Sequence, residues 1–377
     1  MHIGRECCFA TILLIGCLPS AIADDTERLT FDFAVRGIAQ HGQFSNAIKD
    51  DGREIDDRTQ GATIADLALS FSPNSDNHFF AQLRYANGNG FRQTGGVRFA
   101  PYGGDLEDDV TDIGGRDRDY LREAWYRHRL HFSPEISLDL TAGLIDSPNY
   151  IAVNTFFGDE DSQFMNQVFS NNHTAQFPSY DPGGVIDLEA GGLSFTAVYM
   201  TPKTEAGRTY DYYAAQASME RQSRLGAGHL SVFAITTSDK FQNADDTDDD
   251  AGLKSIGLSL DQKLGPIAGV FAEVGFQDDE ADIDFDRIVT LGLNVNGAWW
   301  GRPGDEIGLA YGRANGASAS PFKNSHVTEA YIRMGLSESS DVSLDLQYIK
   351  DSLDNPAAAD DPELLAIGIR FNTYFRL

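Results

Sequence analysis

Apolar residues occupy every second position along many segments of this chain. Residues 29–36 read LTFDFAVR and residues 136–144 read ISLDLTAGL, so that apolar side chains alternate with smaller or more polar ones. The same spacing recurs in VTLGLNV at 289–295, VSLDLQY at 342–348 and LAIGIRF at 365–371. Because successive side chains of a strand point to opposite faces, this pattern predicts β-strands with one apolar and one polar face.

We predict about 16 such strands, most of them near the ~10 residues that a tilted strand needs to cross a bilayer. Unpaired backbone cannot face lipid, so membrane-spanning strands must close into a barrel. The chain is therefore predicted to be all-β, a transmembrane antiparallel β-barrel. The predicted strands cover residues 29–39, 61–72, 78–86, 120–132, 136–145, 184–190, 193–201, 210–220, 226–237, 251–263, 267–277, 287–299, 305–314, 327–337, 341–349 and 364–375.

The connections between these strands alternate between long and short. Short turns such as 133–135 and 301–304 alternate with long connections such as 87–119 and 146–183. Outer-membrane barrels show this asymmetry, with short periplasmic turns and long outward loops, and it places both termini on the periplasmic side. A soluble β-sandwich or β-helix would also give alternating strands, but it would explain neither the loop alternation nor the strand length.

The N-terminus has the features of a secretory signal peptide. Arg5 precedes an apolar run at 7–18, which is too short to span a bilayer, and small residues stand at Ala21 and Ala23. We therefore expect a signal peptide at 1–23 and one outer-membrane barrel at 24–377. All three cysteines precede residue 24, so the mature chain would have no disulfide. As an alternative, the sequence LIGC fits a lipid-attachment site at Cys17.

The net charge of −28 argues against nucleic acid as a partner. Most of this charge lies in the eight long connections, which hold 35 acidic and 12 basic residues. Their acidic clusters lack the glycine and terminal glutamate of a helical calcium-binding loop, so we predict no specific metal site and no cofactor. Solvated loops, or loose divalent-ion bridges to lipopolysaccharide, are the expected role of these acids.

Charged residues within the predicted strands fall on the polar face. A charge facing lipid at mid-depth costs up to about 2–4 kcal/mol, so these side chains should point into the lumen. Opposed acids and arginines there could hydrogen-bond polyols, and two aromatic side chains could stack on sugar rings. A generically polar lumen without a substrate site is the alternative. The predicted wall residues are Arg84, Glu123, Trp125, Arg127, Arg129, Asp139, Glu329, Tyr331, Arg333, Asp345 and Arg370.

The long connection 146–183 contains no Lys or Arg. Its segment 159–169 has helical spacing, with Phe164 and Val168 on one face and three acids in the first turn. We predict a short helix that folds into the pore as a constriction loop. A helix lying on the outer rim is the alternative. The predicted constriction residues are Asp159, Glu160, Asp161 and Gln163.

Two regions resemble the carbohydrate-selective (OprB-type) porin family. The first contains EAWY at 123–126, AGLID at 142–146 and DEDSQFMNQVF at 159–169, and the second contains GRPGDEIGLAYG at 301–312, TEAY at 328–331 and LDLQYI at 344–349. The resemblance implies a passive sugar-permeable porin with a constriction formed by inward-folded loops. It implies that segment 159–169 supplies constriction material and that Trp125, Glu329, Tyr331, Asp345, Gln347 and Arg370 belong to the wall. Porins often assemble as trimers, so a homotrimer is the assembly to consider.

The predicted function is a water-filled, multi-pass channel of the outer membrane for small hydrophilic solutes, with sugars as the expected class. A general cation-preferring porin and a plugged structural barrel are the alternatives, and the sequence does not specify which sugar is preferred. An enzymatic barrel would need a nucleophile and a base, yet the histidines are scattered and none lies in a nucleophile motif. We therefore predict that the protein is not an enzyme.

Overall fold

The computed structural model describes residues 28–48, 52–88, 90–91, 94–104, 121–204, 206–245, 250–354 and 361–377. The expected signal peptide at 1–23 and the alternative lipidation site at Cys17 lie outside the described residues and stay predictions. Within the described ranges, no helix has the length and apolar character needed to cross a membrane.

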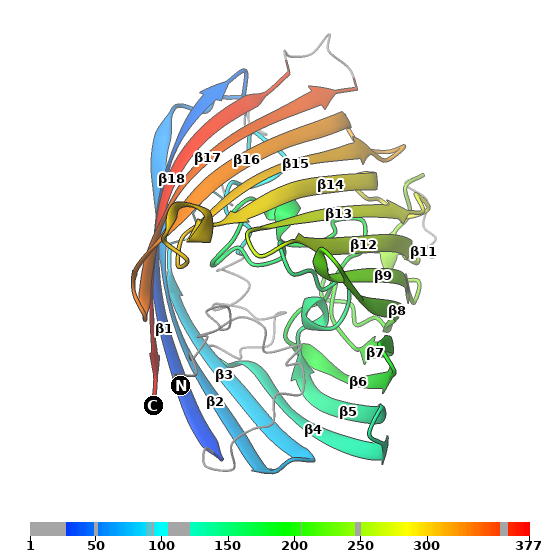
Figure 1. Cartoon of the computed structure of the whole chain (residues 1–377). Helices are drawn as coiled ribbons and strands as arrows, with labels where there is room; N and C mark the ends of the chain where they lie inside the picture. Colours follow the sequence, from blue (N-terminus) through cyan, green and yellow to red (C-terminus); the bar gives the residue numbers. More distant parts are fainter. Residues whose placement is uncertain are drawn as a thin grey trace.

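The described residues form a closed barrel of 16 antiparallel strands, which Figure 1 shows from the side. Each strand pairs with its neighbours along the chain, and β1 closes the barrel by pairing with β18. The strands are β1 Leu29–Ser45, β2 Arg58–Asn74, β3 Asn77–Asn87, β4 Leu121–Ser133, β5 Ile136–Ile145, β6 Asp181–Ala190, β7 Leu193–Met200, β8 Tyr212–Ser223, β9 Gly226–Thr237, β12 Lys254–Leu264, β13 Ala268–Gln277, β14 Phe285–Asn296, β15 Glu306–Gly316, β16 Phe322–Ser337, β17 Ser340–Leu353 and β18 Glu363–Arg376.

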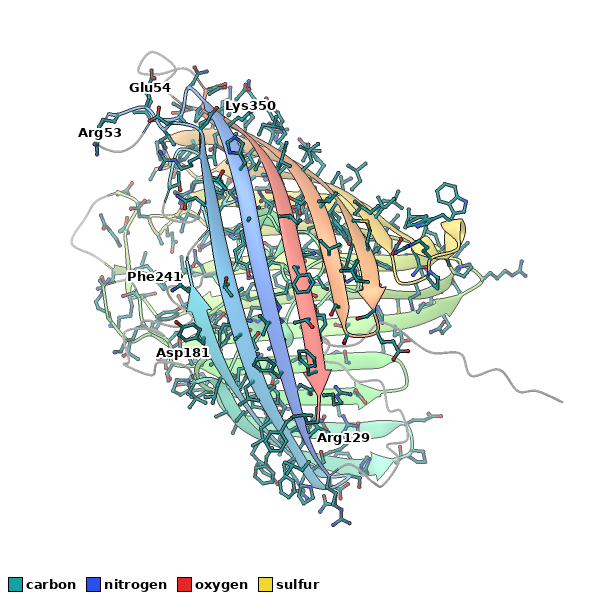
Figure 2. All side chains as sticks on the ribbon, turned by 90° about the vertical axis from the view of Figure 1, so that its left-hand side faces the viewer. Arg53, Glu54, Arg129, Asp181, Phe241 and Lys350 are labelled. Atoms are coloured by element: carbon teal, nitrogen blue, oxygen red, sulfur yellow. The ribbon has the colours of Figure 1, made fainter. Side chains whose placement is uncertain are left out.

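All 16 predicted strands are present, and the prediction of a closed antiparallel barrel is confirmed. The first and last strands lie side by side in Figure 1, and Phe31 and Leu377 exchange backbone hydrogen bonds of 3.1 and 2.9 Å. They lie at the end of the barrel that carries the short turns. Figure 2 shows Glu54 and Lys350 at the opposite end, beside the long connections.

Several strands are longer than predicted; β1 runs to Ser45 and β16 begins at Phe322. Two other boundaries differ for local reasons. The strand expected from 251 begins at Lys254, because Asp250–Ala251 (β11) pairs instead with Phe241–Gln242 (β10) in a separate two-stranded sheet. The strand expected to reach 299 ends at Asn296. There the Asn296 side chain accepts a hydrogen bond from the Ala298 amide and begins the 3₁₀ helix Gly297–Trp300 (η4).

The apolar face of the wall points outward and the polar face points inward, which is the reverse of a soluble barrel. Along β18, large apolar side chains such as Ile367, which is 58% exposed, alternate with buried Ala366, Gly368 and Arg370. Exposed Leu, Ile, Phe and Tyr side chains recur on most other strands in the same phase. This outward apolar face is suited to lipid, while polar and charged side chains face the interior.

The hydrophobic core lies inside the barrel, between the wall and segments that fold into it. One cluster joins Phe164, Val168 and Phe169 to wall residues such as Phe271 and Val327. A second cluster joins Ile151 and Ala175 to residues of the opposite wall. These segments are therefore packed parts of the fold, held by burial of apolar surface.

Candidate functional site: the lumen and its inward-folded segments

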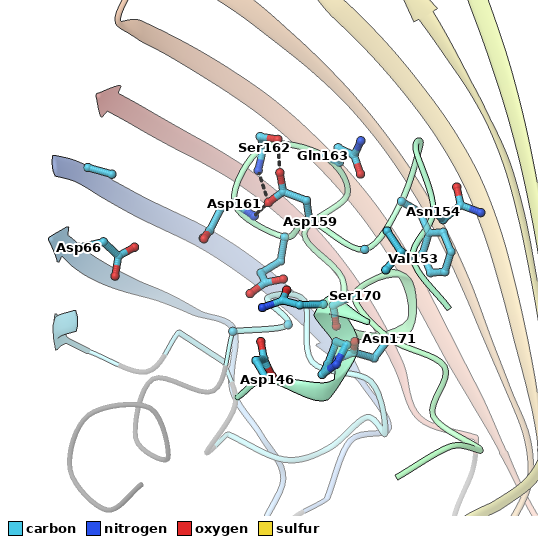
Figure 3. Close-up of a pocket in the computed structure, with 18 of the residues that line it drawn as sticks. Asp66, Asp146, Val153, Asn154, Asp159, Asp161, Ser162, Gln163, Ser170 and Asn171 are labelled. Atoms are coloured by element: carbon cyan, nitrogen blue, oxygen red, sulfur yellow. Dashed lines mark hydrogen bonds between the residues drawn. The ribbon is translucent and has the colours of Figure 1, made fainter. Parts of the chain in front are cut away.

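The connection between β5 and β6, here called the inner loop (residues 146–180), lies inside the barrel. It contains two short 3₁₀ helices, Ser147–Asn149 (η2) and Gln167–Phe169 (η3). Figure 3 shows part of it in close-up, with Asp159 and Asp161 near Asp66 of the β2 wall. The prediction that this connection folds inward agrees with its position in the structure, and the outer-rim alternative does not.

The first half of the inner loop is attached to β12 and β13. The Asn154 side chain donates to Ser259 Oγ at 3.1 Å, and the backbone and hydroxyl of Thr155 both donate to Asp261 Oδ2 at 3.0 Å. Phe157 stacks on Phe271 with ring centroids 5.0 Å apart. Polar and aromatic contacts therefore fix this half against one side of the wall.

The middle of the inner loop is attached farther around the wall, on β16 and β18. Glu329 accepts hydrogen bonds from the Met165 and Asn166 amides, the latter at 2.9 Å. Arg370 donates to the carbonyl oxygens of Glu160 and Gln163 at 2.6 and 3.1 Å. Wall side chains thus form the hydrogen bonds that the backbone amide and carbonyl groups of this buried segment need, because the segment does not pair with a strand.

The prediction of a helix over 159–169 is wrong. Residues 159–163 form a turn, in which Asp159 accepts hydrogen bonds from the Asp161 and Ser162 amides at 2.9 and 3.1 Å and from the Ser162 hydroxyl (Figure 3). Only Gln167–Phe169 is helical, as a single 3₁₀ turn. The helical spacing was misleading because the backbone amides in the middle bind Glu329 rather than carbonyls of the preceding turn.

Small residues on the lumen face of the wall make room for the inner loop. A Cβ atom at Gly269 would lie 1.9 Å from the Phe156 ring, and one at Gly275 would lie 2.1 Å from Thr174 Oγ1. One at Gly312 would lie 3.1 Å from both methyl groups of Val168. Glycines at the lumen-facing positions of the predicted strands are the sequence signal that could have located the surface on which the inner loop packs.

A second segment, residues 94–104 before β4, also lies against the lumen wall. Its Arg98 amide donates to Asp351 Oδ2 of β17 at 2.6 Å. The Pro101 carbonyl accepts from the side-chain amides of Gln40 and Gln347 at 2.9 and 2.8 Å. The sequence analysis did not identify this segment as part of the interior, since it has no periodicity or charge pattern that distinguishes it from an outer loop.

Arginines and aspartates form a buried cluster where the inner loop meets β1, β2 and β3. Arg36 and Arg84 both bind Asp66, with 2.6 Å between Arg84 Nε and Asp66 Oδ1. Asp161 of the inner loop lies 3.3 Å from Arg36 and 3.6 Å from Arg84. Asp161 therefore contacts the arginines and does not face them across an open gap. Arg36 and Asp66 were not among the predicted wall residues, although both fall in the lumen phase.

An irregularity in β4 directs two adjacent charged residues inward. Gln82 pairs with Glu123 and Leu83 pairs with Leu121, which leaves Arg122 as the extra residue of a β-bulge. Arg122 and Glu123 are consequently both buried. The Arg122 guanidinium lies 4.2 Å from the Tyr180 ring centroid, and Trp125 Nε1 donates to Glu123 at 3.1 Å. Strict alternation would have placed the side chains of Arg122 and Glu123 on opposite faces, so the inward position of Arg122 could not be predicted.

A cavity of about 2440 Å³ occupies the lumen between the inner loop and the end with the short turns. Arg84, Arg127 and Trp125 line one side, and Asn294, Glu306 and Arg333 line the other. Acidic side chains outnumber basic ones among the residues around it. The predicted site residues that line this cavity are Arg84, Glu123, Trp125, Arg127, Asp159, Glu160, Asp161, Gln163 and Arg333.

Four predicted wall residues lie beneath the inner loop and do not line the cavity, namely Glu329, Tyr331, Asp345 and Arg370. Glu329 and Arg370 bind the loop backbone, as described above, and the Tyr331 ring packs edge-on against Phe164 at 4.9 Å. Their assignment to direct solute contact is corrected to a supporting role, because the loop covers them. Arg129 and Asp139 also lie outside the cavity lining and form a bidentate pair at 2.6 Å.

Two acids of the inner loop, Asp159 and Glu160, have raised pKa values. Burial, reinforced by the neighbouring carboxylate of Asp161, raises the pKa of both Asp159 and Glu160 above the usual carboxyl range. Glu160 lines the cavity and is half-buried. Among the described residues, no cluster of three or more His, Cys, Asp or Glu side chains has a geometry able to hold a metal ion.

The sequence profile of the carbohydrate-selective porin family, OprB, matches residues 79–375. An uncharacterized protein of Aquifex aeolicus is 27% identical over 259 residues, which cover 68% of this chain and 72% of that protein. The family match covers the inner loop, both sides of the large cavity and all but the first strands of the barrel.

Solved structures with the same architecture include a high-pH structure of Pseudomonas putida OprB. It has a TM-score of 0.72 and 13% identity, and the alignment covers 92% of this chain and 94% of that chain. The outer-membrane channel DcaP of Acinetobacter baumannii has a TM-score of 0.55 and 12% identity, with 92% and 97% of the two chains covered. At these identities the likeness establishes the barrel fold alone.

Proposed function

Because the chain belongs to the OprB family of carbohydrate-selective porins, we propose that neutral sugars pass through its large lumen cavity and are retarded there by polar wall residues. The protein is a multi-pass outer-membrane channel and not an enzyme. The proposal is supported by the lining of this cavity, which has hydrogen-bond donors on one side and acceptors on the other. Guanidinium donors of Arg127 line one side of the lumen, and the carboxylate of Glu306 lines the other.

Hydroxyl groups of a sugar both donate and accept hydrogen bonds, so a wall with both kinds of partner suits them. Hydrogen bonds that involve a charged group contribute about 1.5–3 kcal/mol each, and they replace bonds to water that the sugar loses. A series of such exchangeable contacts slows a sugar without trapping it. Trp125 adds an aromatic surface at the edge of the same cavity.

We further propose that residues 159–163 form the constriction. Arg370 holds the Glu160 and Gln163 carbonyl groups, and Asn372 donates to the Asp161 carbonyl at 2.9 Å. With its backbone fixed on β18, the turn presents the Glu160 side chain to the cavity. The rigid support makes the position of this carboxylate well defined, which a selective contact requires.

The proposal can be tested by sugar permeation and by block of ion current. Liposomes containing the wild-type protein should swell in isotonic sugar solutions at rates that fall with sugar size, and added oligosaccharide should reduce single-channel conductance in a planar bilayer. At about pH 9, where Glu160 is charged, the Glu160→Gln variant should bind oligosaccharide about tenfold more weakly than the wild type, because one charged acceptor is lost. Glu54→Gln, at the exposed outer rim, is the matched control.

Two results would contradict the proposal. If swelling is no faster with sugars than with protein-free liposomes, the channel does not conduct sugars and a plugged barrel is favoured. If Glu160→Gln and Glu54→Gln change oligosaccharide block equally, the turn at 159–163 is ordinary surface charge and the protein is a general porin. Single-channel conductance in salt alone shows whether each variant forms an open barrel.

Assembly as a homotrimer and loose divalent-ion bridges between the outer acids and lipopolysaccharide stay predictions. The apolar outward face of the wall offers surface for either lipid or a neighbouring barrel. The mass of the detergent-solubilised protein, measured by light scattering, distinguishes a monomer from a trimer.

A further inference from the structure

A smaller cavity of about 280 Å³, here called the outer pocket, lies at the end of the barrel that carries the long connections. It is formed where β1 and β13 end and where β14 and β18 begin, and Phe91 and residues 97–101 cover it. Its volume is near the roughly 300 Å³ at the lower end of small-molecule sites. It is separate from the large cavity described above.

Aromatic rings form two walls of the outer pocket. Phe44 and Phe91 lie with their centroids 5.9 Å apart, and Phe99 stacks on Phe285 at 5.0 Å. Phe91, Phe99 and Phe285 are buried, so their positions are fixed by packing. A small pocket edged by aromatic rings suits a partly apolar molecule.

The polar group that marks this pocket is Gln277 at the end of β13. Its side chain lines the pocket and the residue is only 7% exposed. Neither Nε2 nor Oε1 of this amide has a hydrogen-bond partner among the described residues. A buried amide without hydrogen-bond partners is destabilising, so an amide held in this way is suited to a ligand that both donates and accepts.

Other polar groups of the pocket already have partners. Gln167 Oε1 accepts from the Ala100 amide at 3.1 Å, and the ring of His173 bonds the Gln167 carbonyl at 2.7 Å. Arg98 forms an ion pair with Asp284 at the edge of the pocket, so the two charges neutralise each other. This balance favours a neutral ligand over an anion or a cation.

The outer pocket adjoins the large cavity. Gln167, His173 and Gln176 of the inner loop line both spaces, so this part of the loop is a shared partition. The two spaces are therefore neighbours, with this part of the inner loop between them.

We propose that the outer pocket is an entry site that binds one pyranose ring of an incoming sugar before it reaches the constriction. The C–H faces of the ring would lie against the phenylalanine rings, and two of its hydroxyl groups would bond the Gln277 amide. The proposal rests on the proposed function, because it places a second sugar-binding position upstream of the large cavity. A single hydroxylated ring matches the size, the aromatic walls and the unpaired neutral amide.

Two variants test the outer pocket without touching residues 159–163 or the arginine wall. Gln277→Leu keeps the size of the side chain but removes both hydrogen-bonding groups, and Val97→Phe fills the pocket from the covering segment. Gln222→Leu makes the same chemical change at an exposed position near the opposite end and serves as the matched control. Heat-modifiable migration in gels shows whether each variant is a folded barrel.

The measurement is the dissociation constant of D-glucose, from calorimetry on the detergent-solubilised protein and from glucose-induced current noise. We expect Gln277→Leu to weaken glucose binding about 5- to 20-fold, through the loss of two hydrogen bonds. Val97→Phe should weaken it at least as much. Gln222→Leu should match the wild type, and salt conductance of Gln277→Leu should be unchanged. The acyclic hexitol mannitol should bind more weakly than glucose, because it lacks a rigid ring.

The outcomes separate this proposal from the proposed function. If wild-type liposomes swell in glucose and Gln277→Leu binds glucose as the wild type does, the outer pocket is not a sugar site and the porin function stands. Equal binding of mannitol and glucose would likewise overturn a pyranose site. If wild-type liposomes do not swell in any sugar, the proposed function fails, and calorimetry on Gln277→Leu then decides the outer pocket by itself.

Discussion

Three consecutive acids, Asp159, Glu160 and Asp161, have three different roles in the structure. Asp159 closes its own turn by accepting hydrogen bonds from Ser162 and from the Asp161 amide. Glu160 faces the large cavity, and Asp161 binds the arginines of β1 and β3. Residue type alone would make them one acidic patch, whereas the structure gives each of the three a different set of contacts.

The Glu329 side chain should determine how firmly the inner loop is held. Glu329→Ala removes the acceptor of the Met165 and Asn166 amides and leaves two buried donors unpaired, at a cost of about 1–3 kcal/mol each. We expect the loop to loosen, with larger and noisier single-channel conductance in a planar bilayer. Glu329→Gln retains one acceptor oxygen and should show an intermediate effect. Conductance of Glu329→Ala equal to that of the wild type would show that packing alone holds the loop.

At the scale of elements, the inner loop follows the interior of the wall and is supported by several strands along its path. Its contacts reach β12 through Thr155, β16 through Met165 and β18 through Glu160. The glycines that receive it, such as Gly312 on β15, stand on the lumen face of the strands. The inner loop and the wall are therefore complementary in shape, and the shape of the lumen depends on both.

A bulky residue at Gly312 should displace the inner loop. The side chain of Gly312→Leu would overlap Val168, whose methyl groups already lie 3.1 Å from the position of a Cβ atom. We expect higher conductance and weaker oligosaccharide block, measured in planar bilayers. Gly37→Leu on β1 is the control, because a Cβ atom there meets nothing within 4 Å. If both variants behave alike, the fit between glycine and loop does not set the pore size.

At the scale of the whole molecule, charge is distributed unevenly between the two faces and the ends of the barrel. The outward wall is apolar, the long connections carry most of the acidic residues, and acids outnumber bases around the large cavity. Such an arrangement raises the local concentration of cations and is screened by salt beyond a Debye length of about 10 Å at 0.1 M.

We expect the channel to prefer cations, and the preference should be stronger at low salt. It should also rise as pH is raised from about 5 to about 9, because the pKa of Glu160 lies above the ordinary carboxyl range and the group gains its charge late. Reversal potentials in a salt gradient measure this preference, and Glu160→Gln should reduce its pH dependence. Anion preference at neutral pH would indicate that the wall arginines control permeation.

Much of this protein could be predicted from the sequence because a barrel wall obeys a local rule. Alternation of two residues decides which side chains face lipid and which face the interior, and it predicted all 16 strands and the inward direction of residues such as Arg84 and Arg370. The long and short connections followed from the same strands. Neither conclusion needs knowledge of which residues far apart in the chain come together.

Only the tertiary structure decided which inward residues face the cavity. Arg84 and Arg370 both stand at lumen-facing positions of their strands. The inner loop covers Arg370, whereas Arg84 stays on the cavity wall. The turn that replaced the predicted helix at 159–169 depends on Glu329, which lies 160 or more residues later in the chain. These features arise from non-local hydrogen bonds and packing, which a periodic pattern does not encode.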